Sequence, residues 1–249
     1  MSERMSEHQP PSPVLVACSH GTRSGRGAAA VASLVDAVRA AAPGVEVVET
    51  FVDVQQPALP EVVAGLAHRP AVVVPLLLSG GFHVHHDIAG AVAGRPAHVA
   101  AGPLGPHSAI VDVLVTRLRR SGLRADDVVV LGASASSDPR AIADQEATRA
   151  DLSRRLGRSV ALGHVGHCGT PLHEVVSRVR RPGRRVVVAS HLLAPGHFDD
   201  AVGRAGADLA TAPLLDGSRP DERLVSLVLE RYAQARYALE LGRDLAAVG

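Results

Sequence analysis

Residues 14–23 read VLVACSHGTR and decide the fold, because an apolar run ends there in a small polar turn. The same arrangement recurs at 45–53 (VEVVETFVD), which ends on an aspartate, and at 72–83 (VVVPLLLSGGFH), which ends on a histidine. Nearly continuous runs of Val and Leu are typical of parallel strands that have helices on both faces. Each of these three predicted strands therefore leads into a histidine or a carboxylate.

Helical patterns separate the apolar runs, and this alternation predicts a parallel α/β sheet. Ligands of such sheets bind beyond the carboxyl ends of the strands. His20, Asp53 and His83 could therefore converge on one cleft although they lie far apart in the sequence. In the first half, the predicted strands are 14–18, 45–52, 71–78 and 97–101, and the predicted helices are 26–42, 57–68, 86–94 and 107–120.

The second half of the chain repeats this order. Val14 corresponds to Val128 and Leu59 to Leu172, and a repeat of this length indicates duplicated domains rather than a solenoid. The second half has predicted strands at 128–131, 160–162 and 186–189, and predicted helices at 139–156, 171–179, 198–206 and 221–240. We therefore expect an α/β protein of two tandem, similar Rossmann-like lobes, each a parallel sheet flanked by helices, with the active cleft between them.

The expected domain boundaries follow this repeat. They are a disordered leader at 1–12, an N-terminal lobe at 13–123 that carries the metal site, and a degenerate C-terminal lobe at 124–242. The two halves are chemically unequal, because Gly166 or a near neighbour stands where the first half has Asp53. The chemistry is therefore expected in the first half, with the second half as the wall of the cleft.

Composition excludes several classes of function. The net charge is +1 and only 2% of the residues are aromatic, so nucleic-acid binding is not expected. The chain has no lysine, which excludes a Schiff-base lysine and a P-loop lysine. Two cysteines cannot form a disulfide framework. The longest apolar stretch is too short to span a bilayer, and the first residues lack the apolar centre of a signal peptide, so we expect a cytoplasmic protein without membrane contact.

His20, His83 and Asp53 are the candidate metal ligands, because two imidazoles and a carboxylate suit a borderline divalent ion. Each also has a structural interpretation: His20 could bond a loop carbonyl, and Asp53 could be an ordinary turn aspartate. Asp87 follows His83 at helical spacing and could orient its imidazole or cap a helix. The turn around Ser19 is small and rich in hydrogen-bond donors, which suits anions.

The remaining histidines allow further hypotheses. His85 and His86 could be supplementary ligands, although a surface position is favoured. A second group could be a weak metal cluster or a polar wall of the cleft, since its spacing matches no common structural zinc site; it consists of His164, His167, Cys168 and His173. His191 and His197 occupy the turn of the second half that corresponds to His83, and they are expected to face the first half's site.

Four segments together resemble the sirohydrochlorin chelatase family. They are SHGTR at 19–23, FVD at 51–53 with Pro57 following, PLLLSGGFH at 75–83 with Asp87-Ile88 following, and GPLGPH at 102–107. The resemblance runs in order across about residues 14–120, and the degenerate second half resembles the two-domain, fused members. It implies a lyase that inserts Fe²⁺ or Co²⁺ into sirohydrochlorin for siroheme or cobalamin synthesis, in a cleft between two α/β lobes.

The resemblance also implies roles for particular residues. His20 and His83 match the paired histidines, as metal ligands and catalytic groups, and Asp53 stands at an acidic position that is often glutamate. Sirohydrochlorin carries several carboxylates, so Arg23 is the best candidate to orient it. Three further positions, Ser19, Gly80 and Gly81, are expected to contact substrate.

No cofactor beyond the substrate metal ion is expected, because no G-x-G-x-x-G turn or P-loop opens either half. The expected partners are the tetrapyrrole and a divalent metal, with the protein a monomer or a homodimer. One alternative is a histidine-based metal-binding or storage protein without tetrapyrrole chemistry. Another is a regulatory module that binds a small anion at Gly80-Gly81. The sequence leaves iron, cobalt and nickel open as the metal.

Overall fold

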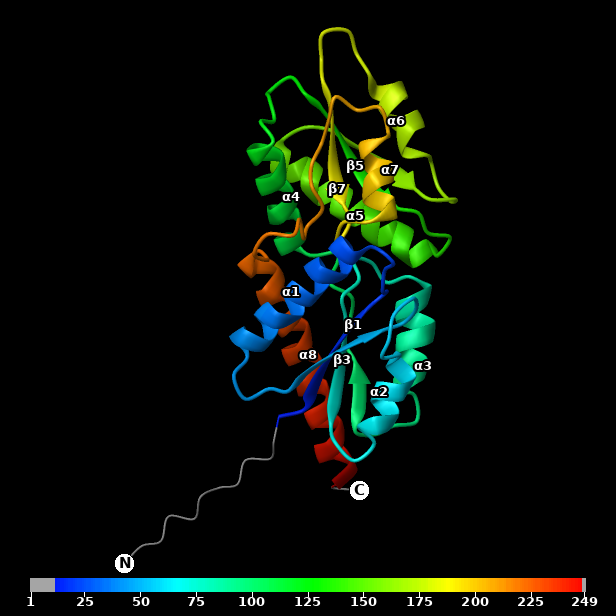
Figure 1. The fold of residues 1–249 in the computed structure, drawn as a ribbon, viewed down its shortest axis with the longest axis vertical. Coiled ribbons are helices and arrows are strands. Elements are labelled where there is room, and N and C mark those ends of the chain that lie inside the picture. The colour runs from blue at the N-terminus through cyan, green and yellow to red at the C-terminus, as the bar shows by residue number, and fades with distance from the viewer. Residues whose placement is uncertain (1–11, 248–249) are drawn as a thin grey trace, which may run out of the picture.

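The structure, a computed structural model, describes residues 12–247, except for the side chains of His85 and of residues 242–247. It consists of two α/β lobes placed one above the other along the longest axis of the molecule (Figure 1). The leader expected at 1–12 falls almost wholly on residues 1–11, which lie outside the described part of the chain.

The first sheet has four parallel strands in the order β2-β1-β3-β4. Leu15 in the central strand pairs with Val47 on one side and with Val72 on the other. The strands of this sheet are β1 (Val14–Ser19), β2 (Val47–Phe51), β3 (Ala71–Pro75) and β4 (His98–Ala100). Every residue of β1 and β3 is buried, as a nearly continuous apolar pattern predicts for strands covered on both faces.

The helices of the first half begin where the sequence supplies suitable residues. Ser24 caps the first helix by accepting a hydrogen bond from the backbone N–H of Gly27, and Pro60 stands in the first turn of the second helix. The helices are α1 (Gly25–Ala41), α2 (Leu59–Gly65), the π-helical turn η1 (His83–Ile88), α3 (Ala89–Val92) and α4 (Ser108–Arg120).

The second sheet repeats the first, with parallel strands in the order β6-β5-β7-β8. Its strands are β5 (Val128–Ser134), β6 (Val160–Val165), β7 (Val186–His191) and β8 (Leu209–Ala210). Its chain segment contains the helices α5 (Pro139–Leu156), α6 (Leu172–Val179), α7 (His197–Gly203) and α8 (Glu222–Ala247). The duplication and the parallel α/β fold predicted from the sequence are confirmed.

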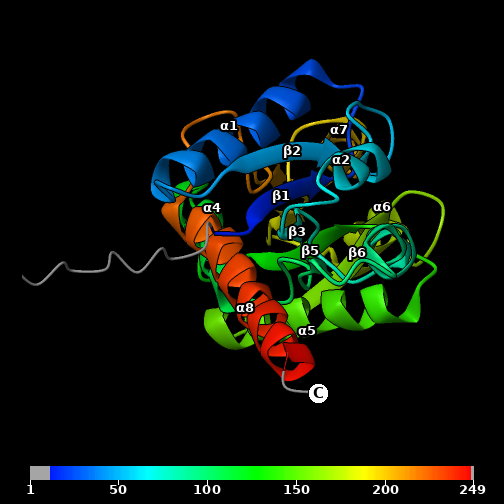
Figure 2. The same ribbon diagram turned by 90° about the horizontal axis from the view of Figure 1, so that it is seen from below.

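The two lobes exchange their last helices. Helix α8 packs against α1, β3 and β4 of the first lobe, whereas α4 packs against α5 and β7 of the second (Figures 1 and 2). The hydroxyl of Tyr232 in α8 donates to the carbonyl of Pro13 at 2.6 Å, and Arg117 in α4 pairs with Asp216. The expected boundaries at 13–123 and 124–242 separate the two repeats along the sequence. In space, each lobe also contains the last helix of the other half.

One hydrophobic core runs through both lobes because of this exchange. It joins Leu34 of α1 and Val228 of α8 to Leu114 of α4 and Leu152 of α5. Two separate clusters cover the other faces of the sheets, one under α2 and η1 and one under α6 and α7. The shared core fixes one lobe relative to the other, and so fixes the loops that meet between them.

Some elements differ from the prediction. The helix expected at 86–94 begins earlier, at His83, because a π-helical turn precedes α3. Strand β8 was not predicted, since its two residues, Leu209 and Ala210, give no readable pattern. Helix α8 continues to Ala247. Within residues 12–247, none of the helices combines the length and the apolar character that a transmembrane segment requires.

Candidate active site at the lobe boundary

His20 and His83 lie side by side. Strands β1 and β3 are neighbours in the sheet, so the residues that follow them meet at the same edge. The two imidazole rings have centroids 4.7 Å apart and are nearly perpendicular, at 89°. The His20 side chain is exposed, and that of His83 is partly buried. The structure therefore brings together two of the three predicted metal ligands.

The loop of His20 is locked onto the loop that follows β2. Gly21 has φ of 88°, and a Cβ atom there would collide with the carbonyl oxygen of Asp53. The backbone N–H of Asp53 donates to the carbonyl of His20 at 3.1 Å, and that of Thr22 donates to the side-chain oxygen of Gln55 at 2.8 Å. Only glycine fits at position 21, because both the backbone angle and the space require it.

The carboxylate of Asp53 takes a different position from the one expected. It is exposed, and its Oδ1 accepts a hydrogen bond from the backbone N–H of Val54 at 2.7 Å. Among the residues that the structure describes, no group of three or more His, Cys, Asp or Glu side chains is placed to hold one metal ion. The short aspartate side chain is thus used to cap its own turn, and the site that is formed is a pair of imidazoles.

Asp87 orients the imidazole of His83. Its Oδ2 lies 2.6 Å from Nδ1 of His83, one turn earlier in η1, and its Oδ1 lies 3.3 Å from Nδ1 of His86. Burial alone would raise the pKa of Asp87, but the hydrogen bonds and charges of His83 and His86 outweigh it and hold that pKa below its usual range. A histidine whose Nδ1 is bound by a carboxylate presents Nε2 as the ligand atom.

π-Helical turns are rare and occur often at functional sites, and η1 carries this pair. His86, in the same turn, is exposed and stacks on the ring of Phe82 with centroids 4.6 Å apart. The side chain of His85 lies outside the described part of the chain. The exposed position of His86 agrees with the surface interpretation, and for His85 that interpretation stays a prediction.

The loop before His83 is held by the second lobe. The backbone N–H of Gly80 donates to Oδ2 of Asp144 in α5 at 2.6 Å. A Cβ atom on Gly81 would stand 3.4 Å from that of Ala141 in the same helix. No sequence pattern predicted this contact, because it joins residues from different halves of the chain. Since the amide of Gly80 already has an acceptor, this contact assigns it a positioning role.

A related contact occurs on the other side of the boundary. Gly27 of α1 lies against the carbonyl of Pro195, and a Cβ atom on Gly196 would stand 3.8 Å from Oγ1 of Thr22. The carboxyl ends of the two sheets therefore face each other across the boundary.

Ser19 is buried at the end of β1. Arg23 is exposed in the turn after His20, where its guanidinium can reach solvent.

The second group of histidines is dispersed. His164 has its Nε2 3.0 Å from the side-chain oxygen of Gln145, whose amide donates to the carbonyl of Ser134 at 2.9 Å. The other members are exposed, and within residues 12–247 they form no metal-binding group; they are His167, Cys168 and His173. The metal-cluster interpretation is therefore not supported, and the alternative, a polar wall of the cleft, stays a prediction.

His191 and His197 do not form a matching pair. His191 is buried, its Nε2 has no hydrogen-bond partner among the described residues, and desolvation lowers its pKa to about 4. His197 is exposed at the start of α7. The expectation that both face the first half's site therefore fails for His191, which belongs to the interior of the second lobe.

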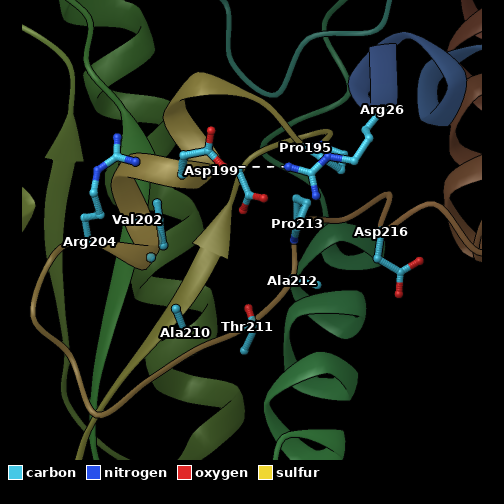
Figure 3. A pocket seen from close by; sticks show the side chains of 12 residues that line it. Arg26, Pro195, Asp199, Val202, Arg204, Ala210, Thr211, Ala212, Pro213 and Asp216 are labelled. Carbon is cyan, nitrogen blue, oxygen red and sulfur yellow. Dashed lines mark ion pairs between the residues drawn. The ribbon is translucent and has the colours of Figure 1, made fainter. Parts of the chain in front are cut away.

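A cavity of about 570 Å³ lies beside α7, between that helix and the segment 210–216 (Figure 3). Arg26 from the first lobe reaches its upper edge and lies 3.8 Å from the carboxylate of Asp200. None of the predicted site residues lines this cavity. The imidazole pair is thus a separate feature of the lobe boundary.

The CbiX family model matches residues 14–121, which contain both imidazoles and Asp87. Over this segment the chain is similar to the CbiX family. The resemblance to sirohydrochlorin chelatases inferred from the four segments is thereby confirmed. Among curated protein sequences, none matches this chain.

Solved structures of CbiX and related proteins share the two-lobe fold. The structure of SirB from Bacillus subtilis with Fe³⁺ has a TM-score of 0.76 at 20% identity, covering 90% of this chain and 96% of that one. The sirohydrochlorin chelatase SirB from Bacillus subtilis subspecies spizizenii, in complex with cobalt, has a TM-score of 0.72 at 18% identity, with coverages of 91% and 96%. CbiX from denitrifying bacteria, described as the terminal enzyme of siroheme biosynthesis, has a TM-score of 0.64 at 14% identity, with coverages of 89% and 99%.

Proposed function

We propose that this protein inserts a divalent metal ion, Fe²⁺ or Co²⁺, into sirohydrochlorin. The observation that carries the proposal is the contact between the His20 and His83 rings, at the boundary of the lobes and within the part of the chain that matches CbiX. Solved relatives of the same fold were obtained with Fe³⁺ and with cobalt. Imidazole is a suitable ligand for both metals, so the imidazole pair is compatible with either ion.

Two imidazoles form an incomplete coordination shell, which suits an ion that must be transferred to the tetrapyrrole. The metal ion is a substrate here, and it has to exchange its ligands for the ring nitrogens of the tetrapyrrole. His83, oriented by Asp87, would hold the ion through Nε2, and His20 lies beside it. Pyrrole protons leave the macrocycle as the metal enters, and an imidazole can accept one of them.

Arg23 is the candidate for binding a carboxylate of the substrate. It is exposed three residues after His20. A guanidinium can bind a carboxylate through two parallel hydrogen bonds, which fixes orientation as well as position. Because insertion transfers no electrons, we expect it to need no redox or nucleotide cofactor besides the metal ion itself.

The alternative, a metal-storage protein, is not favoured by the ligands present. A protein that retains a metal usually surrounds it with four or more protein ligands. The described residues offer no group of even three such side chains. Two imidazoles, one exposed and one partly buried, fit transfer better than retention.

The test is to mix the protein anaerobically with sirohydrochlorin and Co²⁺ or Fe²⁺ and to follow the visible spectrum of the tetrapyrrole. The wild type should accelerate the spectral change, and His20→Ala and His83→Ala should abolish the acceleration with an unchanged circular dichroism spectrum. His173→Ala is the matched control, since His173 is exposed on α6 and away from the pair. Retained turnover in both active-site variants would show that His20 and His83 are not the metal site.

A further inference from the structure

Most of the exposed large apolar side chains among the described residues share one kind of position in the fold. Among the described residues, six large apolar side chains are exposed, and two of these lie on α8. The other four each follow the carboxyl end of a strand, β2, β3, β5 or β7; they are Val54, Phe82, Ile142 and Phe198. The carboxyl ends of the two sheets face each other, so all four belong to loops or first helical turns at the lobe boundary.

Phe82 is the member of this set nearest to the imidazole pair. Its ring is 58% exposed, lies with its centroid 6.0 Å from that of His83, and stacks on His86. Only 2% of the residues in the chain are aromatic, and this exposed phenylalanine lies directly beside the candidate site. One face of the ring is covered by an imidazole, which holds it in place, and the ring remains largely open to solvent.

Phe198 lies after the equivalent loop of the second lobe, one residue beyond the position that matches Phe82. It follows the β7 loop as Phe82 follows the β3 loop, and it is 44% exposed. Its Cε1 atom lies 3.7 Å from the point that a Cβ atom on Gly166 would occupy, and the Cβ of Ala135 lies 3.0 Å from the same point. Phe198 is therefore packed at the loops that follow β5 and β6, on the side of the second lobe that faces the first.

A short series of close approaches links the loops that carry the two rings across the boundary. Ser136, next to Ala135 in the chain, has its hydroxyl 3.8 Å from the point that a Cβ atom on Gly81 would occupy, and Gly81 precedes Phe82. We call these loops of both lobes, which lead from Phe82 through Ala135-Ser136 to Phe198, the rim. The His20–His83 pair lies at the Phe82 end of this rim.

We propose that Phe82 and Phe198, one from each lobe, hold the apolar faces of the tetrapyrrole macrocycle beside the imidazole pair. The proposal rests on the proposed function, because it assigns the substrate of that same site. A flat conjugated ring loses water against an aromatic side chain and packs on it by stacking or by edge-to-face contact. The carboxylates at the periphery of the macrocycle would stay outside these contacts, in solvent or on arginine.

The experiment measures binding and turnover separately. Sirohydrochlorin without metal is titrated into wild type, Phe82→Ala, Phe198→Ala and the double variant, and KM and kcat are measured with Co²⁺. Each single variant should show about a three- to tenfold rise in Kd and KM for sirohydrochlorin with little change in kcat, and Phe82→Trp should restore binding. Tyr237→Ala is the matched control, since Tyr237 is an exposed aromatic residue on α8, and it should leave Kd and KM unchanged.

Three results would overturn the proposal. If the wild type inserts metal and the phenylalanine variants keep its Kd and KM, the proposed function stands and the apolar contacts do not. If the variants change the oligomeric state in gel filtration and leave sirohydrochlorin binding unaltered, the rim is an interface with a second copy. If the wild type neither binds sirohydrochlorin nor inserts metal, the proposed function fails, and the contacts proposed here fail with it.

Discussion

The Nδ1 atom of His83 lies 2.6 Å from Oδ2 of Asp87, within one π-helical turn. This contact fixes the ring of His83 while His20 lies beside it. A carboxylate that binds one ring nitrogen leaves the other as the ligand atom and makes it more basic. The sequence interpretation left open whether Asp87 orients His83 or caps a helix, and the structure shows the contact with the imidazole.

The first prediction concerns this contact. Asp87→Asn should lower the affinity for Co²⁺ by about ten- to a hundredfold, because the amide can donate to Nδ1 and so favours the tautomer with the proton on Nε2. Isothermal titration with Co²⁺ measures the effect, together with the dependence of insertion rate on Co²⁺ concentration. Asp36→Asn is the control, since Asp36 is exposed on α1 and pairs with Arg39. Equal affinities in the Asp87 variant and the wild type would show that the carboxylate has no orienting role.

The second prediction concerns Gly21, which joins the His20 loop to the Asp53 loop. Gly21→Ala adds a strained left-handed conformation and a collision with the carbonyl of Asp53, so it should displace His20 and strongly reduce insertion. Gly44→Ala is a matched control, because Gly44 also has a positive φ but has open space around it. That variant should cost about 1 kcal/mol of unfolding free energy and keep activity. Equal activities of the two variants would contradict this account of the loop.

The sequence predicted the sheets and the imidazole pair well, for a physical reason. Strands buried on both faces need nearly continuous apolar runs, and neighbouring parallel strands end at the same edge. His20 and His83 follow the adjacent strands β1 and β3, so their meeting follows from strand order. Asp53 follows β2, at the same edge, but which way its carboxylate points depends on local hydrogen bonds that the spacing does not reveal.

Other features could not be predicted because they depend on contacts between the halves. The apolar faces of α4 and α8 show that both helices are buried, but they do not show which sheet each one covers. The hydrogen bond from Gly80 to Asp144 joins positions 64 residues apart and has no sequence pattern. The burial of His191 could not be predicted either, because a histidine at the end of a strand occurs both in functional sites and in protein interiors.

The third prediction concerns the contact between Gly80 and Asp144. Asp144→Ala removes the acceptor for a partly buried amide, which should cost about 1.5–3 kcal/mol of unfolding free energy and reduce the insertion rate, since this loop leads into His83. Asp144→Asn keeps an oxygen acceptor and should lie between the wild type and the alanine variant. Urea denaturation and steady-state kinetics together measure both effects. Wild-type stability and rate in the alanine variant would show that the second lobe does not position the loop.

The fourth prediction concerns acid sensitivity. His191 is buried at the end of β7 and has its pKa lowered to about 4 by desolvation, whereas the imidazole in an unfolded chain titrates near 6.5. Between these two values the unfolded state binds a proton that the folded state does not. The free energy of unfolding therefore falls as the pH drops from about 6.5 towards 4, by roughly 3 kcal/mol in total from this residue.

His191→Leu should remove that part of the pH dependence. Leu76 is buried at the corresponding position of β3, one residue after the strand, so the fold accommodates leucine there. Urea denaturation at pH 4.5 and at pH 7 should show a smaller difference for His191→Leu than for the wild type. His173→Leu, at an exposed position, should keep the wild-type difference. If His191→Leu retains the full loss of stability at pH 4.5, the acid sensitivity comes from other groups and the buried imidazole is not its cause.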